Sequence, residues 1–449
     1  MSFPRYLEYK DSGAEWLGDV PSHWRSSFMR WLSRRYSGGT PDKTKLSFWE
    51  DGTIPWLNSG AVNDRLITEP STFITGDALA KSSAKWIPKG ALVMALAGQG
   101  KTKGMVAQLA IASTCNQSMA AIIPGPEILS RFLFWWLESN YQNIRNMAGG
   151  DLRDGLNLEL LGNICCPLPS LAEQTTIVAF LDRETAKIDA LVAEQRRMIE
   201  LLKEKRQAVI SHAVTKGLHP DAPMKDSGIE WLGEVPAHWE VCIFKRLARE
   251  AISGPYGSSL TKAMYVGEGY RVYGQQQVIL DEFSIGDYYI SSDKYSQMER
   301  YSVKPRDLLI TVMGTIGAVA VVPEGVDPGI INPRLVLYRV DETSLLPEFA
   351  QALFRSDLGR VQLDSTSKGT TMEGLNMEII GSVRITVPPV LEQQSILSFL
   401  RTETTKFDAL TTEAQRAIDL LQERRTALIS AAVTGQIDVR GFVSPSHAR

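Results

Sequence analysis

The sequence predicts an α+β protein made of two similar halves, each a mixed α/β domain followed by a long helix. Residues 10–24, KDSGAEWLGDVPSHW, return as residues 225–239, KDSGIEWLGEVPAHW, with twelve of fifteen positions identical. Residues 173–215 and 392–434 align without a gap and share 24 of 43 residues. Both repeats have a period of about 215 to 219 residues, which is too long for a solenoid. The chain is therefore a tandem of two domain-plus-helix units.

The second repeat predicts two long amphipathic helices. Residues 173–213 contain no Pro and no Gly, and apolar residues recur at spacings close to three and four from Ile177 to Val209. Charges of both signs fill the other positions, and Gly217 and Pro220 end the pattern. The second copy repeats it from Ile396 to a stop near Gly435. Each helix covers about 40 residues, or roughly 60 Å.

Each helix has one apolar stripe that must be buried, and the other helix is the simplest partner. A pseudo-two-fold axis relating the two units would make the pair an antiparallel two-helix coiled coil with a domain at each end. The alternative is that each helix packs on its own domain. The expected boundaries are domain 1 at 1–169, the first connector helix at 170–216, domain 2 at 217–388, the second connector helix at 389–436 and a C-terminal tail at 437–449.

The two domains share landmarks but not surfaces. Apolar runs at 91–97 and 307–313 end at glycine, strands follow at 119–123 and 335–340, and helices at 132–141 and 347–359. Gly-Leu-Asn at 155–157 and at 374–376 leads into further strands. Between landmarks, residues 36–86 have little in common with residues 253–301. Two similar frames with dissimilar surfaces indicate one fold that reads two different targets.

Composition excludes several classes of protein. No apolar run of the 449 residues approaches a membrane span, and the N-terminal segment lacks the apolar core of a signal peptide. The four cysteines form no C-x-x-C pair and the five histidines are scattered, so we expect no metal site, reduced thiols and a cytoplasmic location. A net charge of −3 leaves nucleic-acid binding to local patches.

Three motifs carry a family resemblance. They are the K-D-S-G-x-E-W-L-G-x-V-P-x-H-W stretch, the P-L-P-x-L-x-E-Q-x-x-I entrance to the first helix with its variant PPVLEQQSI before the second, and the helix ending A-V-T-G. Together, and in this tandem order, they resemble the specificity subunits of type I restriction–modification systems. The resemblance covers residues from about Tyr6 to Val439.

The resemblance implies two target-recognition domains, held apart by antiparallel helices, that each read one half of a split double-stranded DNA site. It also implies docking of methyltransferase subunits, two being expected, and of restriction/translocase subunits. S-adenosylmethionine, ATP and Mg would be bound by those partners and no cofactor by this chain. The N-terminal copy of the first repeat matches a segment that follows the first helix. The N-terminal segment is therefore the piece that would be expected after the second helix, and the two units would form a closed ring if it were joined there. We therefore expect the termini of the chain to lie close together.

Candidate DNA contacts lie in predicted loops. Lysine and arginine neutralise phosphates, and Asn and Gln can read adenine, although solvated surface or a polar strand edge is the alternative for each. In the first domain the candidates are Lys43, Lys45, Asn58, Ser59, Lys81, Lys85, Gln99, Lys101 and Lys103. In the second they are Tyr256, Ser258, Lys262, Tyr273, Gln275, Gln276, Gln277, Lys294, Arg300 and Lys368. The candidate partner-binding residues on the helices are Arg183, Lys187, Arg197, Lys203, Lys406, Arg416 and Arg424.

No catalytic constellation is apparent. The stretch from Ala95 to Thr102 is similar to a P-loop, but it has Ala at the first glycine position and a poor helix start after it. His23, His238, Trp24 and Trp239 are expected to be structural. There is no G-x-S-x-G elbow and no Asn-Pro-Pro-aromatic methylase tetrapeptide. The sequence thus indicates a non-catalytic DNA-recognition subunit; the alternatives are a self-contained methylase or nuclease, and a protein-interaction scaffold.

Overall fold

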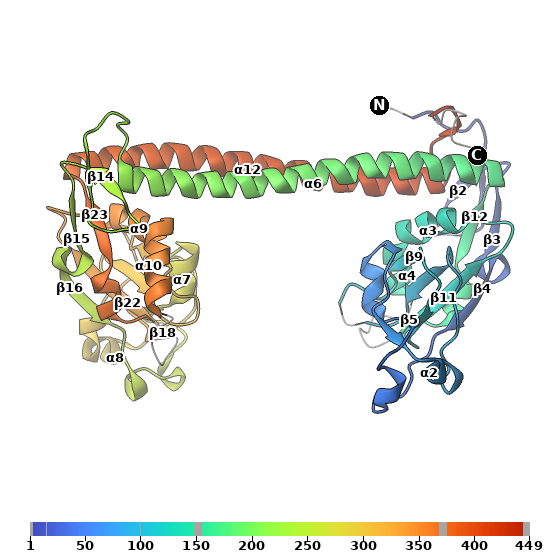
Figure 1. The fold of residues 1–449 in the computed structure, drawn as a ribbon, viewed down its shortest axis with the longest axis horizontal. Helices are drawn as coiled ribbons and strands as arrows, with labels where there is room; N and C mark the ends of the chain where they lie inside the picture. Colours follow the sequence, from blue (N-terminus) through green and yellow to red (C-terminus); the bar gives the residue numbers. More distant parts are fainter. Residues whose placement is uncertain (1–2, 15, 99, 148–154, 368–374, 443–449) are drawn as a thin grey trace. The chain divides into compact units, whose positions relative to one another are not determined.

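The computed structural model describes residues 3–14, 16–98, 100–147, 155–367 and 375–442. The chain folds into two compact units, which we describe one at a time: residues 1–195 with 416–449 form unit 1, and residues 196–415 form unit 2. Each unit contains a sheet-based domain and a stretch of each of two long helices (Figure 1). Within the described residues, none of the helices combines the length and the apolar character that a membrane span requires.

The β-structure of unit 1 comprises β1 (Tyr9–Asp11), β2 (Asp19–Pro21), β3 (Arg25–Phe28), β4 (Ser33–Ser37), β5 (Ile54–Leu57), β6 (Leu66–Ile67), β7 (Thr72–Ile74), β8 (Leu92–Ala95), β9 (Val106–Leu109), β10 (Thr114–Cys115), β11 (Met119–Pro124) and β12 (Cys165–Leu168). The main sheet has the order β4-β11-β8-β9-β6, and only its β6–β9 pair is parallel. A second sheet has the order β10-β5-β7, and two ribbons pair β1 with β2 and β3 with β12.

Unit 2 repeats this plan with β13 (Met224–Asp226), β14 (Glu234–Pro236), β15 (Glu240–Ile243), β16 (Ala248–Ser253), β17 (Tyr270–Tyr273), β18 (Tyr289–Ile290), β19 (Leu308–Thr311), β20 (Val319–Val321), β21 (Gly329–Ile331), β22 (Leu335–Val340) and β23 (Arg384–Val387). Its main sheet, β16-β22-β19-β20, matches β4-β11-β8-β9, and β21-β17-β18 matches β10-β5-β7. The predicted tandem of two mixed α/β halves is confirmed, and β6 is an addition in unit 1.

The short helices also correspond. Unit 1 has α1 (Met29–Leu32), η1 (Leu46–Phe48), η2 (Ser59–Asn63), α2 (Gly76–Ala80), α3 (Ser130–Ser139), α4 (Tyr141–Asn146), α5 (Leu158–Gly162) and η7 (Arg440–Phe442). Unit 2 has η3 (Phe244–Leu247), η4 (Gly257–Ser259), η5 (Lys262–Met264), α7 (Gln275–Leu280), α8 (Ser292–Gln297), η6 (Glu299–Tyr301), α9 (Pro347–Arg355), α10 (Asp357–Ser367) and α11 (Met377–Ser382). Each single helix predicted at 132–141 and 347–359 is wrong in extent, because the chain breaks at Asn140 and Ser356 and a second helix follows.

The two long helices are confirmed as α6 (Leu171–Lys216) and α12 (Val390–Val433). Gly217 follows α6 with φ 76°, and Gly435 lies just beyond α12 with φ 73°. A left-handed residue after a helix is the usual place for glycine, because other side chains are strained there. The two glycines also have matching neighbours: Gly435 lies against Trp24 and Pro21, and Gly217 lies against Trp239 and Pro236.

The helices run antiparallel where they meet within each unit. In unit 1, Arg425 of α12 binds Asp189 of α6 at 3.0 Å. In unit 2, Arg206 of α6 lies 3.6 Å from Asp408 of α12. The residue numbers of each pair add to the same total, so one antiparallel register holds in both units. The start of α6 also packs on its own domain, where Gln174 and Asp182 bind residues of that domain, and its end packs on the other domain, where Ile210 and Val214 belong to the core of unit 2.

Buried side chains join each domain to its stretch of long helix. In unit 1, α3 packs on β9 and β11, and its residues from Phe132 to Leu137 are all buried. The same helix also contacts α6, because Arg131 and Trp135 bind Asp182 at 2.9 and 3.0 Å. In unit 2, α9 packs on β20 and shares a core with Ile210 and Leu400 of the long helices.

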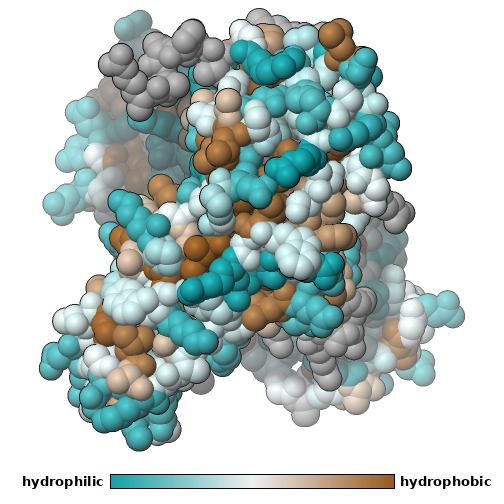
Figure 2. Space-filling model, turned by 90° about the vertical axis from the view of Figure 1, so that its right-hand side faces the viewer, coloured by the Kyte–Doolittle hydropathy of each residue, from teal (hydrophilic) through white to brown (hydrophobic). Residues whose placement is uncertain are grey.

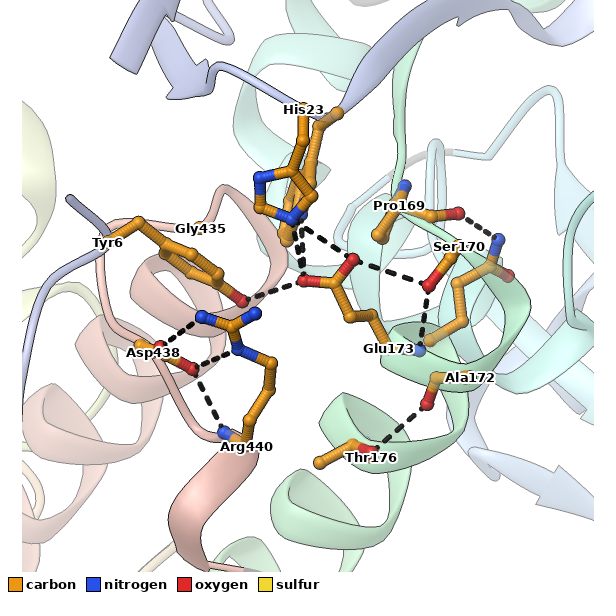
Figure 3. Close-up of polar contacts among 12 residues, drawn as sticks. Tyr6, His23, Pro169, Ser170, Ala172, Glu173, Thr176, Gly435, Asp438 and Arg440 are labelled. Atoms are coloured by element: carbon orange, nitrogen blue, oxygen red, sulfur yellow. Dashed lines mark hydrogen bonds and ion pairs between the residues drawn. The ribbon is translucent and has the colours of Figure 1, made fainter. Parts of the chain in front are cut away.

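The N-terminal segment closes unit 1 against the end of α12 (Figure 3). The backbone nitrogen of Asp438 donates to the carbonyl of Pro4 at 2.8 Å, and the Tyr9 hydroxyl donates to the carbonyl of Gly435 at 2.9 Å. In unit 2 the chain runs continuously through the matching place, from Gly217 to the β13–β14 ribbon. The expectation that the two ends of the sequence lie close together is confirmed by the first and last described residues, Phe3 and Phe442, whose ring centroids are 5.3 Å apart.

Candidate nucleic-acid interface

In unit 1, four loops meet where β5 and β8 end and β11 begins. The nitrogen of Leu96 donates to the carbonyl of Ser118 at 2.8 Å, and the nitrogen of Asn116 donates to the carbonyl of Leu57 at 2.9 Å. The nitrogen of Leu156 donates to the carbonyl of Leu96 at 2.8 Å. We call the segments 57–60, 96–98, 116–118 and 155–157 loop cluster 1.

Unit 2 contains the same three hydrogen bonds at equivalent positions. The nitrogen of Val312 donates to Arg334 at 3.0 Å, that of Asn332 to Tyr273 at 2.9 Å, and that of Leu375 to Val312 at 3.0 Å, each to a carbonyl oxygen. We call the segments 273–276, 312–317, 332–334 and 375–376 loop cluster 2. The backbone frame of the two clusters is therefore shared, although most side chains on it differ.

An Asx turn is the shared element at the centre of each cluster. The side-chain oxygen of Asn116 accepts from the nitrogen of Ser118 at 3.1 Å, and that of Asn332 accepts from the nitrogen of Arg334 at 2.9 Å. Asn commonly forms such local bonds in turns. Both asparagine side chains therefore hold the backbone turn at the centre of their cluster.

The glutamine run of unit 2 divides into different roles. The Gln277 side chain is buried, accepts from the nitrogen of Gly274 at 2.9 Å and donates to the carbonyl of Ile285 at 3.0 Å. Tyr273 is also buried, and its hydroxyl donates to the carbonyl of Asp327 at 2.7 Å. Their prediction as DNA contacts is therefore corrected, because neither side chain reaches the surface. Gln275 is half-buried with its amide engaged inside loop cluster 2, and Gln276 is exposed.

Most of the predicted DNA contacts in the first domain are accessible to solvent. Lys43, Lys45, Asn58, Lys81, Lys85 and Lys101 are exposed and Ser59 is half-buried. Asn58 and Ser59 belong to loop cluster 1, and Lys101 lies in the loop between β8 and β9 that leaves it. The prediction that Lys103 contacts DNA is corrected, because only 5% of this residue is exposed and it cannot present its charge to a phosphate. Gln99 lies outside the described residues.

The loop that resembles a P-loop does not have the P-loop structure. A Walker motif leads from its lysine straight into a helix whose N-terminus faces the phosphates. Here the residues after Lys101 form a turn and enter β9. The loop therefore forms a turn between two strands and lacks the helix that a nucleotide-binding P-loop requires.

In the second domain, the exposed candidates lie on surface turns. Lys262 and Arg300 are exposed and Lys294 is half-buried. The exposed Tyr256 hydroxyl lies 2.5 Å from the Ser253 hydroxyl, and Ser258 lies in the neighbouring turn η4. Lys368 lies outside the described residues.

The candidate partner-binding residues all lie on exposed positions of α6 and α12. Four of them bind acidic residues of their own helix: Arg183 and Lys187 bind Glu184, Lys203 binds Glu200, and Lys406 binds Glu403. Exposed pairs of this kind contribute little to stability, so the charges stay available to a partner. Sequence reasoning missed that several leucines of the same helices are exposed, among them Leu191, Leu201, Leu410 and Leu420.

The cysteines are unsuited to nucleophilic chemistry. Burial raises the pKa of Cys115 to about 12, and burial also raises the pKa of Cys165, Cys166 and Cys242. A thiol needs to lose its proton to act as a nucleophile, and these thiols are protonated at neutral pH.

The surface of unit 1 turned to the viewer in Figure 2 has hydrophilic and hydrophobic residues interspersed. Among the large apolar residues exposed in unit 1 are Trp31 and Phe28, and the guanidinium of Arg30 lies over both rings.

Comparison with known proteins identifies the class of protein to which this fold and these paired clusters belong. The family described as "Type I restriction modification DNA specificity domain" matches residues 35–201 and 265–419. The chain belongs to this family, whose members are the DNA sequence-recognition components of type I restriction–modification systems.

Comparison with individual proteins leads to the same family. The chain is 29% identical over 201 residues to the EcoR124I/EcoR124II specificity subunit of Escherichia coli, covering 43% of this chain and 46% of the relative. It is 22% identical over 433 residues to the EcoKI specificity subunit of Escherichia coli K12, covering 94% of this chain and 90% of the relative. It also resembles a solved chain from work on complex assembly and conformational transition of the type I R-M system, with 18% identity, a TM-score of 0.71 and coverage of 92% and 98%.

Proposed function

We propose that each unit reads one half of a bipartite DNA site through its loop cluster, and that α6 and α12 dock methyltransferase subunits of the same complex. The chain contributes sequence specificity, whereas its partners bind S-adenosylmethionine, ATP and Mg and carry out methylation and cleavage of DNA in the cytoplasm. Restriction/translocase subunits join through the assembled complex.

One observation carries the first part of this proposal. The two clusters share three backbone hydrogen bonds and an Asx turn, yet they present different side chains on that frame. Position 118 is Ser in unit 1, and the equivalent position in unit 2 is Arg334. Base recognition depends on side-chain donors and acceptors, whereas register on the duplex depends on phosphate contacts. One frame with two sets of side chains suits two half-sites of different sequence.

The exposed leucines support the second part. Leu191, Leu201, Leu410 and Leu420 occupy equivalent positions in the two helices and remain exposed. Each directly precedes a less exposed residue, namely Val192, Leu202, Thr411 or Leu421, so each lies on the same flank of its own helix. When antiparallel helices meet through equivalent residues, equivalent flanks lie on one side of the pair. Leu191 and Leu420 of unit 1 would therefore form one apolar strip, and Leu201 and Leu410 of unit 2 another.

The proposed docking surface has a direct test. Burying one leucine stabilises a complex by about 1.5–3 kcal/mol, so Leu410→Glu should weaken assembly with the methyltransferase by at least about tenfold. Thr405→Glu adds the same charge to an exposed position on another flank of the same helix and serves as the control. Native mass spectrometry measures both. Equal assembly by the two variants would show that the leucines do not belong to the interface with the methyltransferase.

The proposed recognition role is tested by reconstitution. The chain incubated alone with S-adenosylmethionine and DNA should transfer no methyl group. Addition of the methyltransferase subunits should produce methylation at one sequence with two specified parts and an unspecified spacer. Methylation by the chain alone, or by the complex without sequence preference, would contradict the proposed function.

A further inference from the structure

Arg334 lies at the exposed edge of loop cluster 2, in the turn that leads into β22. We propose that Arg334 reads a guanine in the DNA half-site of unit 2, and that Gln275 is the positioning residue that holds its guanidinium group. This inference rests on the proposed function and names one base and one side chain within it.

The Gln275 amide is fixed on both sides. Its oxygen accepts from Nη1 of Arg334 at 3.2 Å, and its nitrogen donates to the carbonyl of Met313. The amide lies directly over Gly314, where a Cβ would approach its nitrogen to 3.2 Å. Gly314 has φ 71°, a conformation that glycine adopts without strain. Because both ends of the amide are occupied, Gln275 itself is poorly placed to read a base.

The backbone of Arg334 is fixed as well. Its nitrogen donates to the Asn332 side chain at 2.9 Å, and its carbonyl accepts from the nitrogen of Val312 at 3.0 Å. Only the long side chain extends to the surface, and it starts from a defined position. A donor held in place in this way loses less conformational entropy when it binds DNA.

The guanidinium keeps a free two-donor edge. Within the part of the chain that the structure describes, Gln275 is its one hydrogen-bond partner, which leaves Nε and Nη2 available. Guanine presents two acceptors, O6 and N7, side by side in the major groove, and a bidentate arginine is the commonest specific contact to that pair. A planar guanidinium with one corner already bound fits this requirement.

Other arginines of the same domain are paired differently. Arg249 binds Asp341, Arg306 binds Glu342 and Glu348, and Arg339 binds Asp307. An adjacent carboxylate would repel DNA and compete for the guanidinium donors. Arg334 instead donates a hydrogen bond to the neutral amide of Gln275, so no carboxylate offsets its positive charge. The equivalent position in unit 1 is Ser118, and its neighbour Gln117 binds Thr40, so unit 1 presents different chemistry there.

The test maps methylation in cells that carry the chain with its methyltransferase and restriction partners. Arg334→Ala should retain the Asx turn, because that turn uses the backbone nitrogen. Preference for guanine at one position of one half-site should fall by between about 5- and 150-fold, while the other half-site stays unchanged. Gln275→Ala should lower methylation of the same site without changing the preferred base. Arg300→Ala, which removes an exposed cation from another turn of the domain, should weaken all sites alike.

Two results would overturn the assignment. One is a wild-type half-site that lacks guanine on both strands at the positions read by unit 2. The other is an unchanged recognition sequence in Arg334→Ala with a uniform loss of methylation, which indicates a phosphate contact. Either result leaves the proposed function intact, because that function fails only if the wild-type complex shows no bipartite preference.

Discussion

Glu173, in the first turn of α6, binds the imidazole Nε2 of His23 at 3.0 Å, and Glu392 in α12 binds His238 at 2.7 Å. The two pairs occupy equivalent positions, which confirms the predicted structural role of both histidines. Their surroundings differ. Glu173 also accepts from Trp24 at 3.2 Å, from Tyr6 at 3.3 Å and from Ser170 at 3.3 Å. The buried indole nitrogen of Trp239 has no hydrogen-bond partner among the described residues.

Glu173→Gln should therefore destabilise unit 1 more than Glu392→Gln destabilises unit 2. Several donors lose a charged acceptor, which costs about 1–3 kcal/mol. Burial acts to raise the pKa of Glu173, but the hydrogen bonds from His23 and Trp24 outweigh it and leave the pKa lowered. A lowered folded-state pKa stabilises the protein above the unfolded-state value and loses that effect as pH falls. The difference between wild type and Glu173→Gln should thus shrink below about pH 4.

Hydrogen exchange of residues 4–24 measures the destabilisation of unit 1 directly, because Glu173 holds this segment against α6. Exchange should accelerate in Glu173→Gln at neutral pH, with Glu392→Gln as the control. Equal exchange in both variants would show that the hydrogen bonds to Glu173 do not hold the segment.

Arg425 should be a second point of strong local stability. It is 8% exposed, binds Asp189 at 3.0 Å and Glu138 at 3.2 Å, and Arg65 bridges the same two acids. Arg425→Met removes the buried guanidinium but leaves two partly exposed acids that Arg65 still contacts, and it should cost about 1–3 kcal/mol. Arg206→Met is the equivalent change in unit 2, where the 3.6 Å pair is partly exposed and should contribute less than about 1 kcal/mol. Urea unfolding followed separately in each unit would contradict this view if the two losses were equal.

Lys101 should act through DNA phosphates. Removing one phosphate contact by Lys101→Ala should lower affinity for all sequences and reduce the slope of log affinity against log salt by about one. Lys10→Ala removes an exposed lysine from β1 and should leave that slope unchanged. Fluorescence anisotropy at several salt concentrations gives both slopes. A measurable affinity of the chain for ATP that disappears in Lys101→Ala would contradict the proposed role.

The long helices should set the spacer between half-sites. Four residues added at Glu194 of α6, with four more at the equivalent Glu413 of α12, preserve the antiparallel register and lengthen each helix by roughly 6 Å. Because duplex DNA advances about 3.4 Å per base pair, the spacer should grow by about one or two base pairs. The specified bases should remain the same. Assembly of this variant with unchanged spacing would show that the helices do not set the distance.

Much of the fold could be predicted from sequence, because its strongest signals are local or repeated. The stops at Gly217 and Gly435 and the strands that come after Asn116 and Asn332 follow from nearby residues. The site was harder to predict, because burial depends on distant segments. Tyr273 and Gln277 stand beside exposed Gln276 in the sequence, yet Asp327 and Ile285 bind their side chains. The contact between Gln275 and Arg334 likewise joins residues far apart in the chain, and no local pattern indicates it.

The central claim is that the two units read DNA independently, and one measurement tests it most directly. Residues 25–166 are replaced by the corresponding segment of another family member with a different recognition sequence, and methylation is mapped across the genome. The claim predicts that one half of the bipartite sequence changes to that of the donor while the other half stays as it was. A change in both halves, or in neither, in a chimera that still assembles and methylates DNA would contradict it.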